Sequence, residues 1–249
     1  MEAGPRLRRH GEIRHGVQGI RAGAATRSSV TRRYQNRRNA GRVLATLLGA
    51  YAGRDEVIVL GLPRGGVPVA FEVASALAAP LDVLLVRKLG VPGFVELAMG
   101  AIASGGVRFL NDDVIRANHV PPAAIEAVTA SEWRELERRE QCYRGSRPEP
   151  DLAGRTVILV DDGLATGATM RTAIAAVRAR AAAQIVAAVP VGAPETCEMI
   201  GQVADEVVCA VTPEPFDAVG LLYEDFRATS DHEVIALLRT ARHVHSSTG

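Results

Sequence analysis

Cysteine, aromatic residues and long apolar runs are scarce in this chain. Its three cysteines, Cys142, Cys197 and Cys209, are far apart and form no C-x-x-C pair, which argues for a reducing compartment and against a disulfide framework. The six histidines form no H-x-x-x-H motif, so a zinc site built by the protein alone is not expected. No apolar run approaches the roughly 18 residues that a membrane helix needs. We therefore expect a globular cytoplasmic protein without a membrane partner.

Lysine is almost absent. The chain has 29 basic residues, and Lys88 is the one lysine among them. A bias toward arginine would have replaced a lysine that served only solubility, and the ammonium is a point charge whereas the guanidinium is a planar fork. Lys88 is therefore a candidate functional residue. Aromatic residues make up 4% of the chain against 47% hydrophobic residues, so we expect a core of Ala, Val, Leu and Ile.

Acidic residues are scarce at the beginning of the chain. Residues 1–42 hold eleven arginines and two glutamates, hence a charge of +9, which leaves −8 for the remainder of a chain whose net charge is +1. We predict that residues 1–33 are a basic, disordered extension and that 34–249 are the folded domain. The absence of amphipathic periodicity disfavours a transit peptide. A wrongly assigned translation start is one alternative. Nucleic-acid binding is the weaker one, because no aromatic platform accompanies the arginines.

Short apolar runs alternate with helical patterns along the rest of the chain. This order predicts an α/β fold with a mainly parallel sheet between helices, in which ligands bind beyond the C-terminal strand ends. Residues 87–106 are rich in glycine, and we predict a long loop there. Strands are expected at 57–62, 81–86, 107–110, 156–160, 185–191 and 207–211, and helices at 39–51, 67–78, 121–143, 168–181, 194–202 and 232–242.

The segment 157–170, VILVDDGLATGATM, joins an expected strand to an expected helix. The helix would begin near Gly167, where free amides attract an anion. Glycines let the backbone approach that anion, and the threonines add hydroxyl donors. Asp161 and Asp162 would repel a phosphate alone, but carboxylates accept strongly from a vicinal diol. The segment lacks the lysine of a Walker A loop and the G-x-G-x-x-G pattern. It therefore indicates a sugar phosphate rather than a plain turn.

This segment closely resembles the phosphoribosyl pyrophosphate (PRPP) motif of type I phosphoribosyltransferases, and the similarity covers about residues 34–239. The segments LPRGGVPVA, RKLGVPG-x-x-ELAMGAIA and TPEPF-x-AVG, at 62–70, 87–103 and 212–220, resemble a bacterial group of these proteins. The resemblance implies a Rossmann-like, mainly parallel sheet flanked by helices, with a small C-terminal hood.

The resemblance also implies roles for residues at the strand ends. Asp161 and Asp162 would hold the ribose hydroxyls. The 5′-phosphate would lie on Ala165, Thr166, Gly167, Ala168 and Thr169. The pyrophosphate would lie on the loop Leu62–Gly66, through Pro63, Arg64, Gly65 and Gly66. A non-proline cis peptide is expected between Pro63 and Arg64. Mg²⁺ would be held mainly by PRPP and water, with no direct protein ligand.

Further roles concern the leaving group and the acceptor. Lys88 would face the leaving pyrophosphate, whereas Arg87 would pair within the fold. Residues 89–103 would be a flexible loop that closes and excludes water. Glu96 in that loop would act as general acid or base, with a solvated carboxylate as the alternative. A hood at 212–226 would bind the acceptor or, equally, clasp the last helix. Its contact residues would be Phe216, Tyr223, Asp225 and Phe226.

The function predicted from this resemblance is transfer of the 5-phosphoribosyl group from PRPP to a nitrogenous base, with release of pyrophosphate. Ala165 stands where six-oxopurine enzymes carry an acid, which argues against hypoxanthine and guanine. A homodimer is common in this fold. A PRPP or nucleotide sensor of the same fold, without turnover, is the first alternative, and a sugar-phosphate hydrolase is the second. Lys88 and the long loop favour the enzyme over the sensor.

Overall fold

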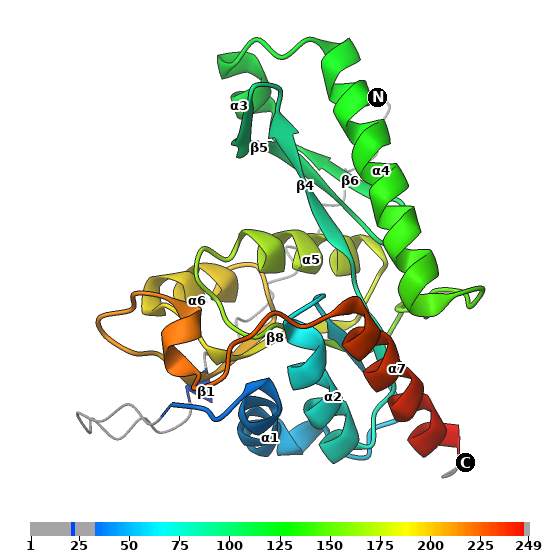
Figure 1. Cartoon of the computed structure of the whole chain (residues 1–249), viewed down its shortest axis with the longest axis vertical. Coiled ribbons are helices and arrows are strands. Elements are labelled where there is room, and N and C mark those ends of the chain that lie inside the picture. Colours follow the sequence, from blue (N-terminus) through cyan, green and yellow to red (C-terminus); the bar gives the residue numbers. More distant parts are fainter. Residues whose placement is uncertain (1–20, 23–32, 247–249) are drawn as a thin grey trace, which may run out of the picture.

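A parallel sheet of six strands forms the centre of the computed structural model, which describes residues 21–22 and 33–246 (Figure 1). Every strand pair in it is parallel, as predicted. All residues of the middle strands are buried, because helices cover both faces of the sheet. Across the sheet the strands are β1 (Arg21–Ala22), β9 (Glu206–Val211), β8 (Gln184–Val191), β7 (Thr156–Val160), β2 (Val57–Gly61) and β3 (Leu81–Val83).

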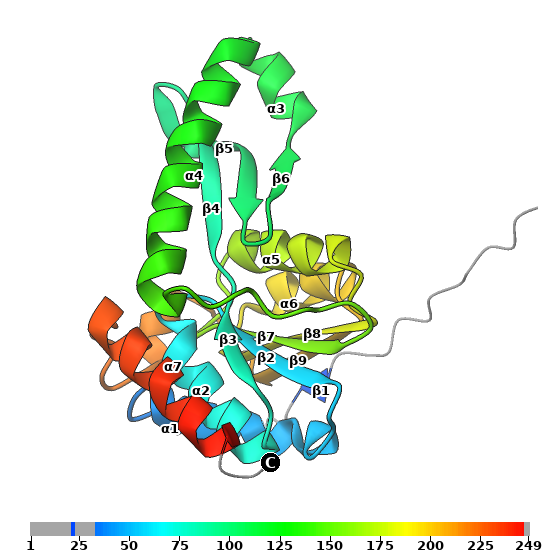
Figure 2. The ribbon, with the colours of Figure 1, turned by 90° about the vertical axis from the view of Figure 1, so that its right-hand side faces the viewer.

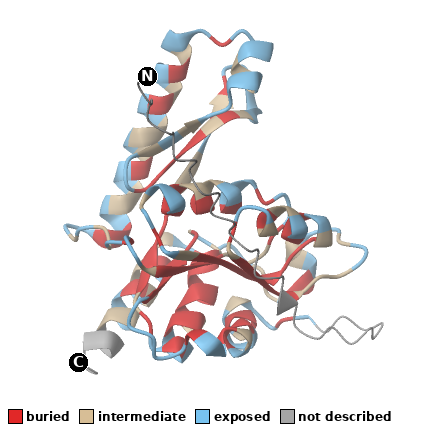
Figure 3. Ribbon diagram, turned by 180° about the vertical axis from the view of Figure 1, so that it is seen from behind, coloured by how far each residue is buried: buried red, intermediate tan, exposed pale blue. Residues whose placement is uncertain are grey.

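Two layers of helices sandwich this sheet. Alternate residues of β2 enter different clusters, since Val57 and Val59 pack toward one layer, and Ile58 and Leu60 toward the other. Figure 3 shows the resulting concentration of buried residues in the sheet and on the helix faces that meet it. One layer holds α1 (Arg37–Leu47), α2 (Gly66–Leu77) and α7 (Asp231–Ser246), and the other holds α5 (Ala168–Ala179) and α6 (Pro194–Gly201). Two short 3-10 helices are η1 (Gly49–Tyr51) and η2 (Val219–Leu222).

Residues 86–144 form an arm that stands away from the central sheet (Figures 1 and 2). Its antiparallel sheet has the order β4-β5-β6. The long helix expected near 121–143 runs along this sheet, and a short helix that the sequence analysis missed precedes it. The elements are β4 (Val86–Val91), β5 (Phe94–Ala103), β6 (Val107–Leu110), α3 (Asp112–Ala117) and α4 (Pro122–Arg144).

The long loop predicted at 87–106 is wrong, because β4 and β5 form a hairpin there. The glycines serve close strand contacts rather than a loop. A Cβ on Gly90 would lie 2.7 Å from the carbonyl oxygen of Val95, and one on Gly100 would lie 2.3 Å from that of Phe109. The register of the hairpin shifts at Gly90. Glycine here allows paired strands to approach closely, a use that composition alone does not separate from a loop.

Arg144, the last residue of α4, anchors the arm to the central domain. Its side chain is 4% exposed. Nε lies 3.1 Å from Oδ2 of Asp82, and Nη2 donates to the carbonyl oxygen of Val83 at 2.6 Å. Nη1 reaches Glu140 at 3.3 Å and Glu149 at 3.2 Å. One guanidinium therefore joins α4, β3 and the segment before β7.

Two residues of the predicted disordered extension are ordered. Arg21 and Ala22 form β1, which pairs in parallel with Val208 and Cys209 of β9. The edge of β9 offers unpaired backbone groups to this short strand. Residues 1–20 and 23–32 of the predicted extension lie outside the described part, so its disorder stays a prediction. Within the described part, no helix is both long and apolar enough to cross a membrane.

Candidate active site

Two loops leave the neighbouring strands β2 and β7 at the same edge of the sheet. Gly61 is in register with Val160, and the amide of Leu62 donates to the carbonyl oxygen of Val160 at 2.9 Å. Each loop leads into a helix whose N-cap is a glycine without a capping side chain, Gly65 for α2 and Gly167 for α5. At α2 the amides of Gly66 and Val67 donate to the carbonyl oxygens of Leu62 and Arg64, and Pro68 has no N–H. The amides left for an anion are therefore those of Arg64 and Gly65 in the first loop and those of the first turn of α5, which begins at Ala168.

The loop at 161–169 has a fixed inner side and an open outer side. The Leu164 amide donates to the carbonyl oxygen of Val191 at 2.9 Å, and the hydroxyl of Thr196 donates to that of Ala165 at 2.7 Å. Gly167 has φ +73, which suits glycine. The side chains of the loop do not fill it. Its exposed residues are Ala165, Thr166, Ala168 and Thr169.

Asp161 and Asp162 lie between the two helix starts. The amide of Asp162 donates to Oδ1 of Asp161 at 2.9 Å. Burial of its carboxyl group, followed by the charge of Asp162, raises the pKa of Asp161 well above its usual range. Oδ2 of Asp162 lies 2.7 Å from Nε of Arg37. Asp162 therefore has a cationic partner within the fold, whereas the ionised form of Asp161 is electrostatically unfavourable.

The loop at 62–66 packs directly on these acids. A Cβ on Gly65 would lie 2.0 Å from Oδ2 of Asp162, and one on Gly66 would lie 2.6 Å from the carbonyl oxygen of Val160 and 2.9 Å from Cα of Asp161. The peptide between Pro63 and Arg64 is cis, as predicted. Glycine at both positions is therefore what allows the two loops to touch.

Replacing Gly66 with alanine is expected to force the two loops apart, because the atoms that the new Cβ would meet are backbone atoms. Overpacking of this kind costs about 1–3 kcal/mol, measurable as a lower free energy of unfolding in urea. Gly49→Ala is the matched control, since a Cβ there has nothing within 4 Å. Equal stabilities of the two variants would show that the loops are not in tight contact.

Arg64 turns from its loop toward the start of α7. Nη1 lies 3.9 Å from Oδ1 of Asp231, and the Arg64 side chain is 47% exposed. The hydroxyl of Tyr143 at the end of α4 also donates to Asp231. Arg64 is therefore a half-exposed cation that reaches the start of α7, and its contact with pyrophosphate stays a prediction.

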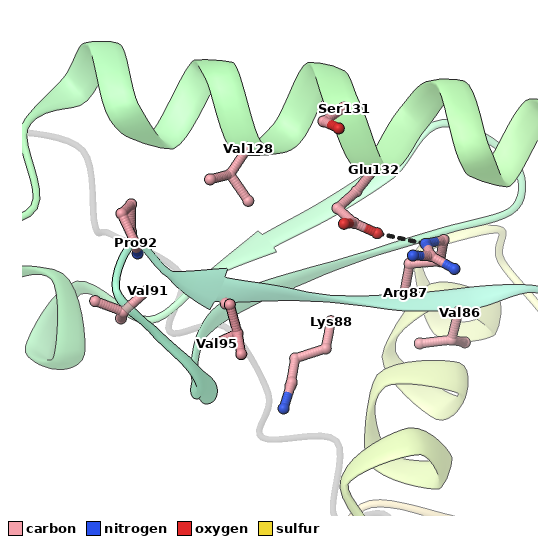
Figure 4. A pocket seen from close by; sticks show the side chains of 10 residues that line it. Val86, Arg87, Lys88, Val91, Pro92, Val95, Val128, Ser131 and Glu132 are labelled. Carbon is pink, nitrogen blue, oxygen red and sulfur yellow. Dashed lines mark hydrogen bonds and ion pairs between the residues drawn. The ribbon is translucent and has the colours of Figure 1, made fainter.

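Lys88 and Glu96 are on the hairpin of the arm and contact each other. Nζ of Lys88 lies 3.2 Å from Oε2 of Glu96. Arg87 pairs with Glu132 of α4, as predicted, and points to the other face of the hairpin (Figure 4). That face borders a cavity of about 480 Å³ against α4.

Among the described residues, neither Lys88 nor Glu96 has a hydrogen bond or ion pair with the loops at 62–66 and 161–169. The structure thus does not bring these two predicted residues into contact with the others. The physical reason is that the chain leaves the central sheet after its edge strand β3, and that β4, which carries Lys88, belongs to the separate sheet of the arm.

The hood is built differently from the prediction. Tyr223 is buried, so it is not free to stack on an acceptor. Its ring centroid lies 4.9 Å from that of Phe226 and 5.5 Å from that of Tyr34, and its hydroxyl donates to the carbonyl oxygen of Asp162 at 2.5 Å. Phe216 packs, partly buried, against the same cluster. Within this cluster, Tyr223 ties the hood to the loop at 161–169 through its hydroxyl, which corrects the assignment of Tyr223 to stacking.

Asp225 also has a partner in the hood. It pairs with Arg227 at 2.7 Å, and this interaction lowers the pKa of Asp225 to about 2. The predicted hydrogen bond between Asp225 and the acceptor substrate would therefore have to compete with the ion pair that Asp225 makes with Arg227.

Part of the hood precedes α1 and was not predicted from the sequence. The amide of Tyr34 donates to the carbonyl oxygen of Leu222 at 2.8 Å, and that of Asp225 donates to Gln35 at 3.0 Å. Burial raises the pKa of Tyr34 to about 12. Arg37 follows this strand-like segment. Tyr34 could have been noticed as an isolated aromatic residue after a basic stretch. Nothing in the sequence distinguishes Arg37 from the other arginines.

Comparisons with known proteins agree with this geometry. A family model described as phosphoribosyl transferase domain matches residues 29–224. Two proteins of Mycobacterium tuberculosis named as candidate phosphoribosyl transferases, MT0597 of strain CDC 1551 and Rv0571c of strain H37Rv, are each 50% identical over 216 residues. The match covers 87% of this chain and 48% of each relative, so the chain spans about half their length.

A solved structure is also similar over most of the chain. The crystal structure of TT1426 from Thermus thermophilus is 43% identical, with a TM-score of 0.73 over 83% of this chain and 97% of that one. The match of the family model to most of the chain, together with these likenesses, shows that the protein belongs to the phosphoribosyl transferase domain family.

Proposed function

We propose that the protein transfers a 5-phosphoribosyl group from PRPP to a nitrogenous acceptor and releases pyrophosphate. The observation that carries the proposal is the pair of uncapped helix starts, at Gly65 and Gly167, with two adjacent acids between them. PRPP has the matching order of groups, since a vicinal diol separates its 5′-phosphate from its pyrophosphate. The free amides at the start of α5 suit the 5′-phosphate, the loop amides of Arg64 and Gly65 suit the pyrophosphate, and carboxylates suit the diol.

Each group of PRPP has an assigned place in this proposal. The 5′-phosphate lies on the exposed loop Ala165–Thr169, where the hydroxyls of Thr166 and Thr169 make no hydrogen bond with the described residues. The diol lies on Asp161 and Asp162. The pyrophosphate lies on the loop Pro63–Gly66, where the amides of Arg64 and Gly65 have no hydrogen-bond acceptor among the described residues, beside the cationic Arg64 side chain.

Transfer breaks the bond between ribose C1 and the pyrophosphate oxygen, which keeps the electron pair. The lone pair of the acceptor nitrogen forms the new bond to C1, and the proton of that nitrogen passes to a base. The loop amides and Arg64 stabilise the charge that develops on the leaving group. Lys88 and Glu96 take part only after the hairpin closes over the ribose. Closure would also cover Phe94 and Val95, which are 69% and 68% exposed.

Magnesium fits this site as a cation that arrives with the substrate. No group of three or more His, Cys, Asp or Glu in the described part is arranged to hold a metal. Asp161 and Asp162 offer oxygen atoms near the expected diol, and Mg²⁺ keeps several waters and binds phosphate oxygens readily. When bound, the cation neutralises part of the pyrophosphate charge.

The direct test is pyrophosphate release from PRPP and Mg²⁺ with a panel of adenine, hypoxanthine, guanine, uracil and orotate. We expect release that depends on one acceptor, with hypoxanthine and guanine inactive because Ala165 supplies no acid. PRPP binding without release would favour the sensor, which the separation of Lys88 from the loops also suits. PRPP loss without any acceptor would indicate a hydrolase.

A further inference from the structure

Arg37 is the first residue of α1, and its side chain contacts two segments that are far from it in the sequence. Nε donates to Oδ2 of Asp162 at 2.7 Å. Nη1 donates to the carbonyl oxygen of Arg227 at 2.7 Å, and the guanidinium carbon lies 4.0 Å from the ring centroid of Phe226. The side chain is 11% exposed. A single cation, largely shielded from solvent, thus touches the loop at 161–169 and the hood at once.

The contact with Asp162 fixes the position of that carboxylate. Oδ2 lies between Arg37 and the 62–66 loop, since a Cβ on Gly65 would be 2.0 Å from Oδ2 and 3.2 Å from Nε of Arg37. The backbone of Asp162 is held separately, by the hydroxyl of Tyr223. Among the described residues, Oδ1 of Asp162 accepts no hydrogen bond. Arg37 therefore occupies one oxygen atom and leaves the other for a ligand.

We propose that Arg37 is a positioning residue that holds the Asp162 carboxylate for the ribose diol and ties it to the hood at Phe226 and Arg227. The inference rests on the proposed function and adds a coupling between the ribose site and the acceptor side. Any shift of the hood moves the guanidinium, and the guanidinium moves the acid that grips the ribose.

Charge and shape make separate contributions to this role. The planar fork of arginine binds Asp162 and Arg227 together while its face lies on Phe226, whereas a lysine keeps the charge but not the fork. The charge of Arg37 also lowers the pKa of Asp161, opposing burial and Asp162. The other titratable group that faces these acids is the hydroxyl of Tyr223, whose pKa burial raises, so that it stays protonated.

Titration calorimetry of the full chain with PRPP and Mg²⁺ across a range of pH tests the role. Arg37→Gln is expected to weaken PRPP binding about tenfold or more, as expected for a charge-assisted hydrogen bond. It should also move the acid limb of the binding profile to higher pH, because the pKa of Asp161 rises when the cation is lost. Arg37→Lys should weaken binding but leave the limb in place.

Arg42→Gln is the matched control. Arg42 lies on the same helix and pairs at 3.6 Å with Glu72, with its side chain 57% exposed, and its loss should change neither affinity nor limb. Circular dichroism confirms that each variant is folded. Wild-type affinity and an unmoved limb in Arg37→Gln would overturn the inference, while PRPP binding by the wild type would leave the proposed function standing. If the wild type does not bind PRPP, both the proposed function and the role of Arg37 are wrong.

The tie to the hood has its own test. Phe226→Leu removes the ring from the guanidinium, and without any acceptor it should weaken PRPP binding about twofold to fivefold, as expected for a lost cation–π contact. In the Arg37→Gln background the same change should have no further effect. Equal effects in both backgrounds would show that the hood and Asp162 are not coupled through Arg37.

Discussion

Replacing Asp161 with asparagine is expected to stabilise the ligand-free protein while weakening its binding of PRPP. Burial and the neighbouring Asp162 raise the pKa of Asp161 well above its usual range, so its ionised form is unfavourable in the folded chain. An asparagine oxygen can still accept the hydrogen bond from the Asp162 amide. We expect a gain of about 0.5–2 kcal/mol in the free energy of unfolding at neutral pH, the range of single stabilising substitutions.

The pH dependence of that gain follows from the direction of the shift. Because the folded-state pKa exceeds the unfolded value of about 4, the folded wild type binds more protons between the two values. Its free energy of unfolding therefore falls as pH rises through this window, and the asparagine variant lacks this loss. Urea denaturation should show little difference between the two proteins at or below about pH 4 and a growing difference above it.

PRPP binding should change in the opposite direction. Loss of a carboxylate that accepts from a ribose hydroxyl removes about 1.5–3 kcal/mol, or about 10- to 100-fold in affinity. Asp55→Asn is the control, because Asp55 is exposed just before β2, at the opposite end of that strand. An Asp161→Asn variant that is less stable than the wild type would contradict the claim that ionised Asp161 destabilises the folded protein.

Replacing Arg144 with alanine is expected to have the largest effect on stability. The side chain of its partner Asp82 is 12% exposed, and the substitution leaves that carboxylate without its buried cation. Breaking a buried ion pair in this way costs about 3–5 kcal/mol. The hydrogen bond to the carbonyl oxygen of Val83 is lost as well. Urea denaturation followed by the fluorescence of Trp133, on α4 of the arm, should report the change.

Arg138→Ala provides the comparison on the same helix. Arg138 pairs with Glu135 three residues earlier, and its side chain is 60% exposed. Pairs of this kind contribute little, because water screens them. Similar unfolding curves for Arg144→Ala and the wild type would show that the arm is held by other contacts.

The central sheet and the loop at 161–169 were predictable because the sequence patterns that indicate them are local. A buried parallel strand requires a continuous apolar run, as in β7, and the acids, glycines and threonines that follow it lie within a few residues of one another. The order of strands and helices then fixed which loops share an edge of the sheet. The cis peptide at Pro63–Arg64 was expected only because the loop at 62–66 resembles that of the family.

The arm and the hood depend on partners that the sequence does not place. Gly100 allows β5 to lie close to Phe109 on the paired strand β6. Until that pairing is known, the glycines of this segment suggest a loop. Tyr223 looked available for stacking, but Tyr34 near the start of the chain buries it. Arg37 acts through contacts with Asp162 and Arg227. Such long-range contacts leave no local pattern, so residues of this kind emerge only with the fold.

Calorimetric titration of the wild-type chain with PRPP in Mg²⁺, beside ribose 5-phosphate and pyrophosphate, tests the central claim most directly. The two helix starts and the acids between them predict one site per chain. PRPP should bind more tightly than either fragment, and its affinity should fall about 10- to 100-fold in Asp161→Asn. Absence of PRPP binding, or equal affinity of the wild type and this variant, would contradict the account.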